Sequence, residues 1–239
     1  MKITFLGTGM LTAKSGSTSF VVDDHILFDI GNGVTDALVE NGLDTKNIDT
    51  IVVSHFHTDH FGDIMYFVTK RYLLGETNSE LKIIGPVGTQ EKVEGLYKIM
   101  NFDIAGGELL NINKIKYIEL DNGNEYQGEG FSLKAFNVIH GKSRCLGYVF
   151  ANSQGMLGYS GDSAYTQEII ENIPNADNWV IEANDIDEFK GWHIGLKNIE
   201  ELAAKHTDID FYVVHRRDKE YTTPLTNIHL PNDGDSVEV

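Results

Sequence analysis

The sequence predicts an α/β fold in which β-sheets are covered by helices. Short apolar strand patterns recur along all 239 residues, and helix patterns lie between many of them. Each half of the chain starts with mostly β elements and ends in mixed elements, and sheets covered by helices give a layered sandwich. The length suits one domain with a sizeable core. Because no linker or short repeat interrupts residues 1–239, we expect a single domain.

The first half begins with strands and then alternates strands with helices. Apolar and polar residues alternate over residues 2–6 and end in Gly7, which predicts a first strand. Asp23 and Asp24 form a turn signal, so residues 17–22 and 26–28 are expected to pair as a hairpin. The next expected elements are a helix over 34–41 closed by Gly42, a strand over 50–53, a helix over 63–74 capped by Asp63, a strand over 81–84 and a helix over 89–100.

The second half shows shorter strand patterns. Residues 114–136 are expected to form several short strands with glycine-rich turns, and residues 146–150 and 156–159 a second hairpin. The remaining expected elements are a helix over 166–173, a strand over 179–182, a helix over 199–205 and a last strand over 211–214. The acidic tail over 231–239 is expected to be loosely held.

The net charge limits which partners the chain can bind. It carries 36 acidic and 19 basic side chains, with a formal net charge of −17. A protein that grips duplex or structured RNA usually presents a basic face, and this chain has no long run of Lys or Arg. The balance argues against a large nucleic-acid footprint. A small anionic substrate held by metal ions is compatible with it, because bound ions add positive charge that the count omits.

Cysteine usage and hydropathy point to a reducing compartment. Cys145 is the single cysteine, which excludes an intramolecular disulfide and a cysteine-based structural zinc site. The first residues are too short in apolar side chains for a signal peptide. No apolar stretch approaches the ~18 residues needed to span a bilayer. We therefore expect a cytoplasmic protein without membrane contact, in which Cys145 is a buried, inert thiol.

The strongest functional signal directly follows the expected strand over 50–53. Four ligand-type residues occur within six positions: His55, His57, Asp59 and His60. Alternate residues of an extended segment point the same way, so His55 and His57 can share one metal ion. Asp59 and His60 lie on the following turn and can bind a second ion. Imidazole and carboxylate ligands suit zinc first, with manganese or iron as alternatives.

This histidine motif, together with the early run from Phe5 to Gly9, resembles the metallo-β-lactamase superfamily. More narrowly, it resembles the branch that contains ribonuclease Z and its smaller phosphodiesterase relatives. Further segments follow in the order typical of that branch: Asp29-x-Gly31, His140 followed by Gly147-Tyr148, Gly161-Asp162-Ser163, Glu182, His193 and His215. The order extends over nearly the whole chain. The resemblance implies a four-layer αββα sandwich of the metallo-β-lactamase type.

The resemblance also implies a role for each matching residue. His140 would complete the first metal site with His55 and His57. Asp162 would bridge both ions, because a carboxylate has two oxygens. His215 would complete the second site with Asp59 and His60. His193 would act as a proton donor near the metals, and Glu182 would orient its imidazole. The expected catalytic residues are therefore His193, Glu182 and Asp59.

The implied activity is hydrolysis of a phosphodiester with two divalent metal ions. Ribonuclease Z members that process tRNA precursors usually carry a long clamping arm, which in bacterial members often falls between the lone His and the G-D-[ST] motif. Here 162 − 140 = 22 positions separate His140 from Asp162, and the second hairpin fills them. We therefore expect a small substrate, above all a cyclic nucleotide. Lys142, Ser143 and Arg144 are candidates for contacting its phosphate or ribose.

Other functions stay open. An arm elsewhere, for instance within residues 77–114 around Gly106 and Gly107, would favour tRNA 3′ processing, the activity of ribonuclease Z. A non-catalytic binding protein on the same fold is disfavoured by the complete ligand set. The same metals would also support hydrolysis of a carboxylic or sulfate ester. The branch includes phage cyclic-nucleotide phosphodiesterases with an anti-defence role, and its members are commonly homodimers, so we expect a homodimer.

Overall fold

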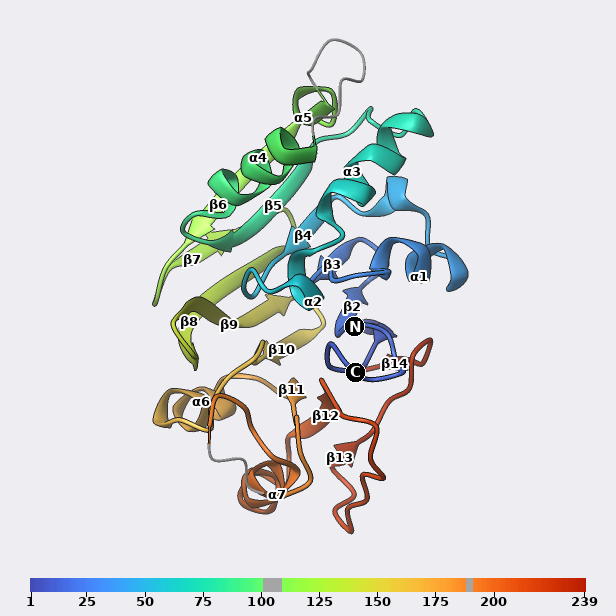
Figure 1. Ribbon diagram of the computed structural model, residues 1–239. Helices are drawn as coiled ribbons and strands as arrows, with labels where there is room; N and C mark the ends of the chain where they lie inside the picture. Colours follow the sequence, from blue (N-terminus) through green and yellow to red (C-terminus); the bar gives the residue numbers. More distant parts are fainter. Residues whose placement is uncertain (101–108, 188–190) are drawn as a thin grey trace.

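Two mixed sheets packed face to face form the centre of the molecule (Figure 1). The computed structural model describes residues 1–100, 109–187 and 191–239. Within these residues each sheet has seven strands, in the order β14-β1-β2-β3-β4-β5-β6 in the first and β13-β12-β11-β10-β9-β8-β7 in the second. Helices lie on the outer faces, so the layers follow the expected αββα order.

The first sheet and its helices are built almost entirely from the first half of the chain. Their bounds are β1 Lys2–Gly7, β2 Ser19–Val22, β3 Ile26–Phe28, α1 Val34–Glu40, η1 Thr45–Asn47, β4 Thr50–Val52, α2 Thr58–Phe61, α3 Ile64–Leu73, β5 Leu81–Pro86, α4 Thr89–Met100, α5 Leu109–Ile112 and β6 Ile115–Leu120. The sheet is completed by β14 Ser236–Glu238, which pairs with β1. The end of the chain therefore supplies the edge strand of the first sheet, next to β1.

The second sheet and its helices follow. Their bounds are β7 Glu125–Gln127, β8 Phe131–His140, β9 Ser143–Asn152, β10 Gly155–Tyr159, α6 Gln167–Asn172, η2 Ile173–Asn175, β11 Asn178–Glu182, α7 Leu196–Lys205, β12 Asp210–Val214 and β13 Ile228–His229. Among the helices of the described residues, none is long and apolar enough to cross a membrane.

Strands β2, β3 and β4 are buried along their whole length, because helices cover one face of the sheet and the other sheet covers the second face. In β2, Phe20 packs between the sheets while Val21 packs under the helices, and both are fully buried. Aromatic rings fill the space between the sheets: Phe20 stacks on Phe28 with ring centroids 4.7 Å apart and meets Tyr159 edge-on at 5.1 Å. This inter-sheet core holds the strand ends of the two sheets in a fixed relation.

The expected elements are present, with three corrections. The tail is not loosely held: β14 pairs Ile3 with Val237 along β1. The acidic composition of the tail was misleading because backbone pairing with an open sheet edge does not depend on it. Asp63 begins α3 but does not cap it, and its side chain instead accepts a hydrogen bond from Thr35 N at 2.8 Å. The short strands expected before residue 136 include one long strand, β8, that runs to His140.

The parallel half of each sheet determines where functional groups gather. Strands β3 and β4 are parallel neighbours in the first sheet, and β10, β11 and β12 are parallel neighbours in the second. Carboxyl ends of parallel strands meet at one edge of a sheet, the usual place for functional groups in such folds. The two edges face each other across the sandwich, and the predicted site residues follow these strand ends.

Candidate metal centre

Side chains from both sheets converge at the carboxyl ends of the strands. The residues predicted as metal ligands are placed as follows: His55 and His57 follow β4, Asp59 and His60 lie in α2, His140 ends β8, Asp162 follows β10, and His215 follows β12. Ligand atoms of these residues form two groups that can each hold a metal ion. The structure therefore brings all seven together, although they span 160 positions of the chain, 215 − 55.

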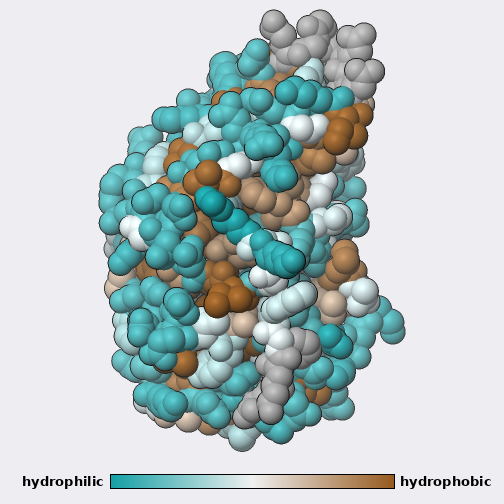
Figure 2. Space-filling view, turned by 60° about the vertical axis from the view of Figure 1, so that its left-hand side comes forward, coloured by the Kyte–Doolittle hydropathy of each residue, from teal (hydrophilic) through white to brown (hydrophobic). Residues whose placement is uncertain are grey.

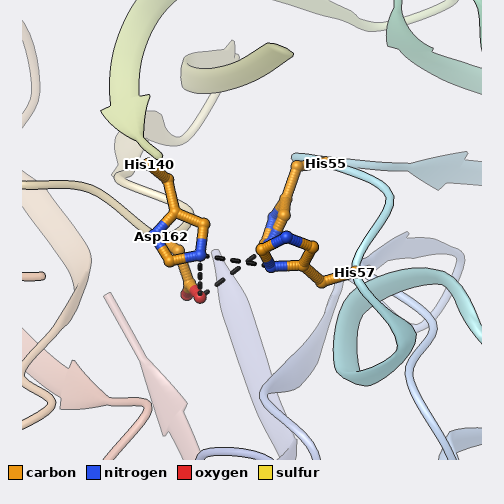
Figure 3. Close-up of side chains that lie close together, drawn as sticks. All are labelled: His55, His57, His140 and Asp162. Carbon is orange, nitrogen blue, oxygen red and sulfur yellow. Dashed lines mark hydrogen bonds and ion pairs between the residues drawn. The ribbon is translucent and has the colours of Figure 1, made fainter. Parts of the chain in front are cut away.

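The first group contains His55, His57, His140 and Asp162 (Figure 3). His140 Nε2 lies 3.1 Å from His57 Nδ1 and 3.6 Å from Asp162 Oδ2. His55 Nε2 lies 3.9 Å from the same oxygen. Three imidazoles and a carboxylate that point at one space are a donor set suited to zinc.

The second group contains Asp59, His60 and His215, and it adjoins the first through Asp162. His60 Nε2 lies 3.3 Å from Asp162 Oδ1, and His215 Nε2 lies 3.4 Å from Asp162 Oδ2. His215 Nε2 also lies 3.5 Å from Asp59 Oδ2. Both oxygens of Asp162 therefore face ligand-type nitrogens, which is the arrangement that a bridging carboxylate requires.

Buried atoms of this cluster fit divalent cations. His55 Nε2, His60 Nε2 and Asp162 Oδ1 are buried and form no hydrogen bond within the described residues. Polar atoms buried without a partner are costly, and two metal ions, one in each group, would satisfy all three. Burial lowers the pKa of His55 well below its usual value, so this imidazole is neutral and able to bind a metal.

The carboxylates of the cluster are held in their charged form. Burial alone would raise the pKa of Asp162, but the charges of His215 and His60 outweigh it and leave the pKa well below its usual value. Burial likewise opposes ionisation of Asp59, while a hydrogen bond from His215 lowers its pKa to about 2. Ionised carboxylates between imidazoles are the charge pattern that favours a bound cation.

His193 and Glu182 lie beside the second group. His193 Nδ1 donates to Glu182 Oε2 at 2.9 Å, and Ser163 N donates to Glu182 Oε1 at 2.6 Å. Glu182 is almost fully buried, whereas His193 is partly exposed and lines the pocket. Glu182, His193, Asp162 and His215 also form a third group that can approach an ion. The hydrogen bonds that Glu182 accepts from His193 and Ser163 favour a positioning role for this carboxylate instead.

Asp29 is a functional residue to which sequence reasoning assigned no role. Its Oδ2 accepts hydrogen bonds from His60 Nδ1 at 2.7 Å, from Ser54 Oγ at 2.7 Å and from Tyr159 OH at 2.5 Å. A ligand histidine usually donates its other nitrogen to such a carboxylate, which fixes the tautomer and the ring orientation. The Asp29-x-Gly31 signature was the signal that could have identified it.

The other half of that signature has a steric reason. A Cβ placed on Gly31 would lie 2.0 Å from Asp59 O, so only glycine lets the β3 exit pass beneath α2. Asp29 itself has φ 54° and His215 has φ 55°. Left-handed backbone in non-glycine residues is costly and clusters at functional sites, and both residues point into this centre.

A pocket of about 400 Å³ opens above the cluster. Its polar wall is formed by members of the cluster and by His193, while Met10, Leu11 and Phe56 form an apolar wall. No sequence signal identified these three, because apolar loop residues resemble core residues. Trp192 does not line the pocket: its carbonyl accepts a hydrogen bond from His140 Nδ1 at 2.9 Å and its indole packs near Gly141.

The candidates for substrate contact lie on the turn after His140 and at the start of β9. Ser143 Oγ lies 3.3 Å from His57 Nε2, so this hydroxyl reaches the cluster. Arg144 pairs instead with Asp121 at 3.7 Å, and Lys142 is exposed. Cys145, in β9, is buried, and burial raises the pKa of its thiol to about 12. The expectation of a buried thiol is therefore confirmed.

The chain was compared with known families and structures. The model of the beta-lactamase superfamily domain matches residues 25–216. A ribonuclease Z of Staphylococcus carnosus is 32% identical over 149 residues, which cover 59% of this chain and 46% of that protein. Another, from Methanosarcina acetivorans, is 32% identical over 154 residues, covering 62% and 47%. The chain thus spans about half the length of the curated relatives it matches.

Solved structures show the same fold. The short form of human tRNase Z superposes with a TM-score of 0.79 at 18% identity, covering 100% of this chain and 99% of that one. A diphosphatase from the PhnP family superposes with a TM-score of 0.78, also at 18% identity, covering 100% and 97%. These likenesses confirm the expected sandwich.

Proposed function

Because the chain belongs to the β-lactamase superfamily, we propose that it is a hydrolase that cleaves a phosphodiester with two divalent metal ions, preferably zinc. One observation carries the proposal: seven ligand-type side chains converge, and three of their buried atoms form no hydrogen bond with any residue that the structure describes. When bound, the two ions would activate water and neutralise charge on the phosphate. His55, His57 and His140 would hold one ion, Asp59, His60 and His215 the other, with Asp162 between them.

The protein's own residues complete the chemistry. Glu182 accepts from His193 Nδ1 and so fixes the imidazole at the pocket wall. In that position His193 would give a proton to the leaving oxygen as the bond from phosphorus breaks. Asp59 would take part in the chemistry through the ion that it would hold with His60 and His215. A phosphodiester requires no acyl-enzyme, so no serine nucleophile is needed.

We further propose that the substrate is small, and a cyclic nucleotide in the first instance. The pocket of about 400 Å³ falls in the size range of small-molecule sites. The β9–β10 hairpin occupies residues 143–159 of the segment between His140 and Asp162, so a clamping arm has no room there. A surplus of 17 acidic residues, 36 − 19, would repel a long polyanion away from the metals. Figure 2 shows a face covered mostly by hydrophilic residues.

A second candidate is tRNA 3′ processing. It is favoured by the ribonuclease Z relatives, which match over 59% of this chain. Any clamp would need to lie elsewhere, and within residues 77–114 the described part forms β5, α4 and α5. Gly106 and Gly107 lie outside the described residues. The catalytic centre would be the same for both substrates, so the choice depends on the groove around it.

A panel assay with metal-loaded protein tests the proposal. It should compare cAMP, cGMP, cCMP, cUMP, bis(p-nitrophenyl) phosphate and a 3′-extended tRNA at matched metal and salt. We expect turnover of at least one cyclic nucleotide and little cleavage of the tRNA. Efficient endonucleolytic cleavage of the tRNA, with no turnover of any cyclic nucleotide, would contradict the small-substrate proposal. Carboxylic and sulfate esters of p-nitrophenol in the same panel test the remaining ester chemistries.

The assembly and location of the protein are also proposals. We propose a homodimer, because members of the ribonuclease Z and phosphodiesterase branch, which this chain resembles, are commonly homodimers. Light scattering would measure the mass of the assembly. We propose that residues 1–239 act as one catalytic domain, since ligands come from both sheets. The single, buried Cys145 supports a cytoplasmic location.

A further inference from the structure

A second pocket opens beside the candidate metal centre and shares one wall with it. Phe56, which lies between the ligand-type residues His55 and His57, lines both the metal pocket and a neighbouring pocket of about 360 Å³. The other residues around this second pocket come from α2 and α4: Phe61, Glu91, Lys92, Gly95, Leu96 and Ile99. The hydrolysis proposed above uses none of them.

Four of the side chains that line this pocket are apolar: Phe56, Phe61, Leu96 and Ile99. Phe56 meets Phe61 edge-on with ring centroids 5.3 Å apart, and Phe56 and Leu96 are partly buried against the first-sheet core. Ile99, at the end of α4, is 82% exposed. An aromatic and aliphatic surface that adjoins a polar centre is the usual form of a site that binds the apolar part of a small ligand.

Gly95 keeps the pocket open. It lies inside α4, where glycine is the least favourable residue apart from proline. Its backbone does not require glycine, since it is not among the residues with positive φ. A Cβ placed on Gly95 would meet no heavy atom within 4 Å. A side chain at this position would therefore extend into the pocket without disturbing the helix.

We infer that this pocket binds an apolar, aromatic group that stays attached to the phosphate after cleavage. The inference rests on the proposed function, which places the phosphate at the metals. Phe56 lies just after β4 of the first sheet. His193, the proposed proton donor, lies in the loop between β11 of the second sheet and α7. Water adds to phosphorus, the bond to the leaving oxygen breaks, and the proton goes to that oxygen near His193. The retained group then faces Phe56, and a nucleobase is one aromatic group of this kind.

Two substrates with the same leaving group test the inference. Bis(p-nitrophenyl) phosphate retains an aromatic group, and methyl p-nitrophenyl phosphate retains a methyl group. We expect Gly95→Leu to lower kcat/KM for the first by about tenfold, mainly through KM, because a filled apolar pocket excludes its ligand. The second substrate should change by less than about twofold, since a methyl group needs no pocket. Metal content should be unchanged, and Tm equal or higher.

Lys98→Leu is the matched control, because it adds the same side chain to α4 next to a different hollow, which Gln90 and Glu94 border. Ile99→Ser, at an exposed position, should lower kcat/KM for bis(p-nitrophenyl) phosphate and leave kcat/KM for methyl p-nitrophenyl phosphate unchanged. A binding readout is also available: by calorimetry, phenyl phosphate should bind wild type more tightly than methyl phosphate, and Gly95→Leu should abolish the difference.

The possible failures are distinguishable. If wild type hydrolyses both substrates and Gly95→Leu lowers kcat/KM for both equally or for neither, the pocket assignment is overturned. The proposed function is then intact. Wild type that hydrolyses no phosphodiester overturns the proposed function and the assignment with it. Equal binding of phenyl and methyl phosphate to wild type overturns the assignment alone.

Discussion

The imidazole of His193 is held at the pocket wall by a buried carboxylate. Both oxygens of Glu182 lie within 3.0 Å of His193 Nδ1. The hydrogen bond fixes the tautomer, so the proton on Nδ1 faces Glu182 and the other nitrogen is the one that exchanges protons with substrate. This arrangement places the free nitrogen at the pocket wall, as the proposed general acid requires.

We expect His193→Ala to keep its metal and lose turnover. Loss of a general acid typically lowers turnover by ~10²–10⁴-fold. Turnover and metal content should be measured on the same preparation. Unchanged turnover would show that His193 is structural and that water supplies the proton. A parallel loss of metal would show that the third group, with Glu182 and His193, is a metal site.

Asp29 acts on the second metal group through His60. We expect Asp29→Asn to weaken metal binding by ~10–100-fold, because an amide NH₂ in place of Oδ2 would face three donors. Asparagine adopts the left-handed region readily, so the φ of 54° is retained. Titration of the metal-free protein with zinc measures the effect. Unaltered binding of both ions would show that His60 keeps its orientation without Asp29.

At the scale of elements, the end of the chain holds the loop that forms the apolar wall. Asp233 Oδ1 accepts hydrogen bonds from Thr8 N at 2.8 Å and Thr8 Oγ1 at 2.9 Å, and its Oδ2 accepts from Gly16 N at 2.6 Å. The loop between these two residues carries Met10 and Leu11. The loop also contacts the segment after His215: Met10 N donates to Arg216 O, and Lys14 N donates to Asp218 Oδ1 at 2.9 Å.

We expect Asp233→Asn to raise KM several-fold while metal content stays unchanged. The amide cannot accept from Gly16 N, so the loop loses one fixed end; one lost hydrogen bond costs about 1 kcal/mol of unfolding free energy. Steady-state kinetics and urea unfolding measure the two effects. Asp235→Asn is the control, because among the described residues the Asp235 side chain accepts hydrogen bonds from Asn232 alone, within its own turn. Equal effects of both variants would contradict the positioning role.

At the scale of the whole molecule, metal ions would join the two sheets. His55 and His57 follow a strand of the first sheet, whereas His140, Asp162 and His215 lie at or just after strand ends of the second. A ligand that binds only the folded state stabilises it by mass action. Two ions held between the sheets would therefore contribute to the stability of the sandwich as well as to its chemistry.

We expect protein purified without chelator to contain close to two equivalents of metal per chain, measured by elemental analysis. Chelation should abolish turnover and lower Tm, since metal at ~1,000 times its Kd stabilises by ~4 kcal/mol. Adding zinc back should restore both. Full activity in a metal-free preparation would contradict the proposed function as a whole.

The sequence by itself predicted most of the element order and the candidate residues of the centre. Apolar runs identified the buried strands, since a strand covered on both faces has no polar side. The density of ligand-type residues from His55 to His60 indicated a metal-binding centre, because few other chemistries need imidazole and carboxylate so close together. The ordered motifs supplied the remaining candidates, His140, Asp162 and His215.

Only the tertiary structure decided how distant segments complete the centre. Three contacts join segments that are far apart in sequence. They are the pairing of β14 with β1, the hydrogen bonds of Asp29 with His60 and Tyr159, and the hydrogen bonds that Asp233 accepts from Thr8. Local periodicity carries no information about such partners, because it reports only which face of an element is buried. The pocket that shares Phe56 with the metal centre likewise depends on distant segments, because it forms where α4 packs beside the segment that follows β4.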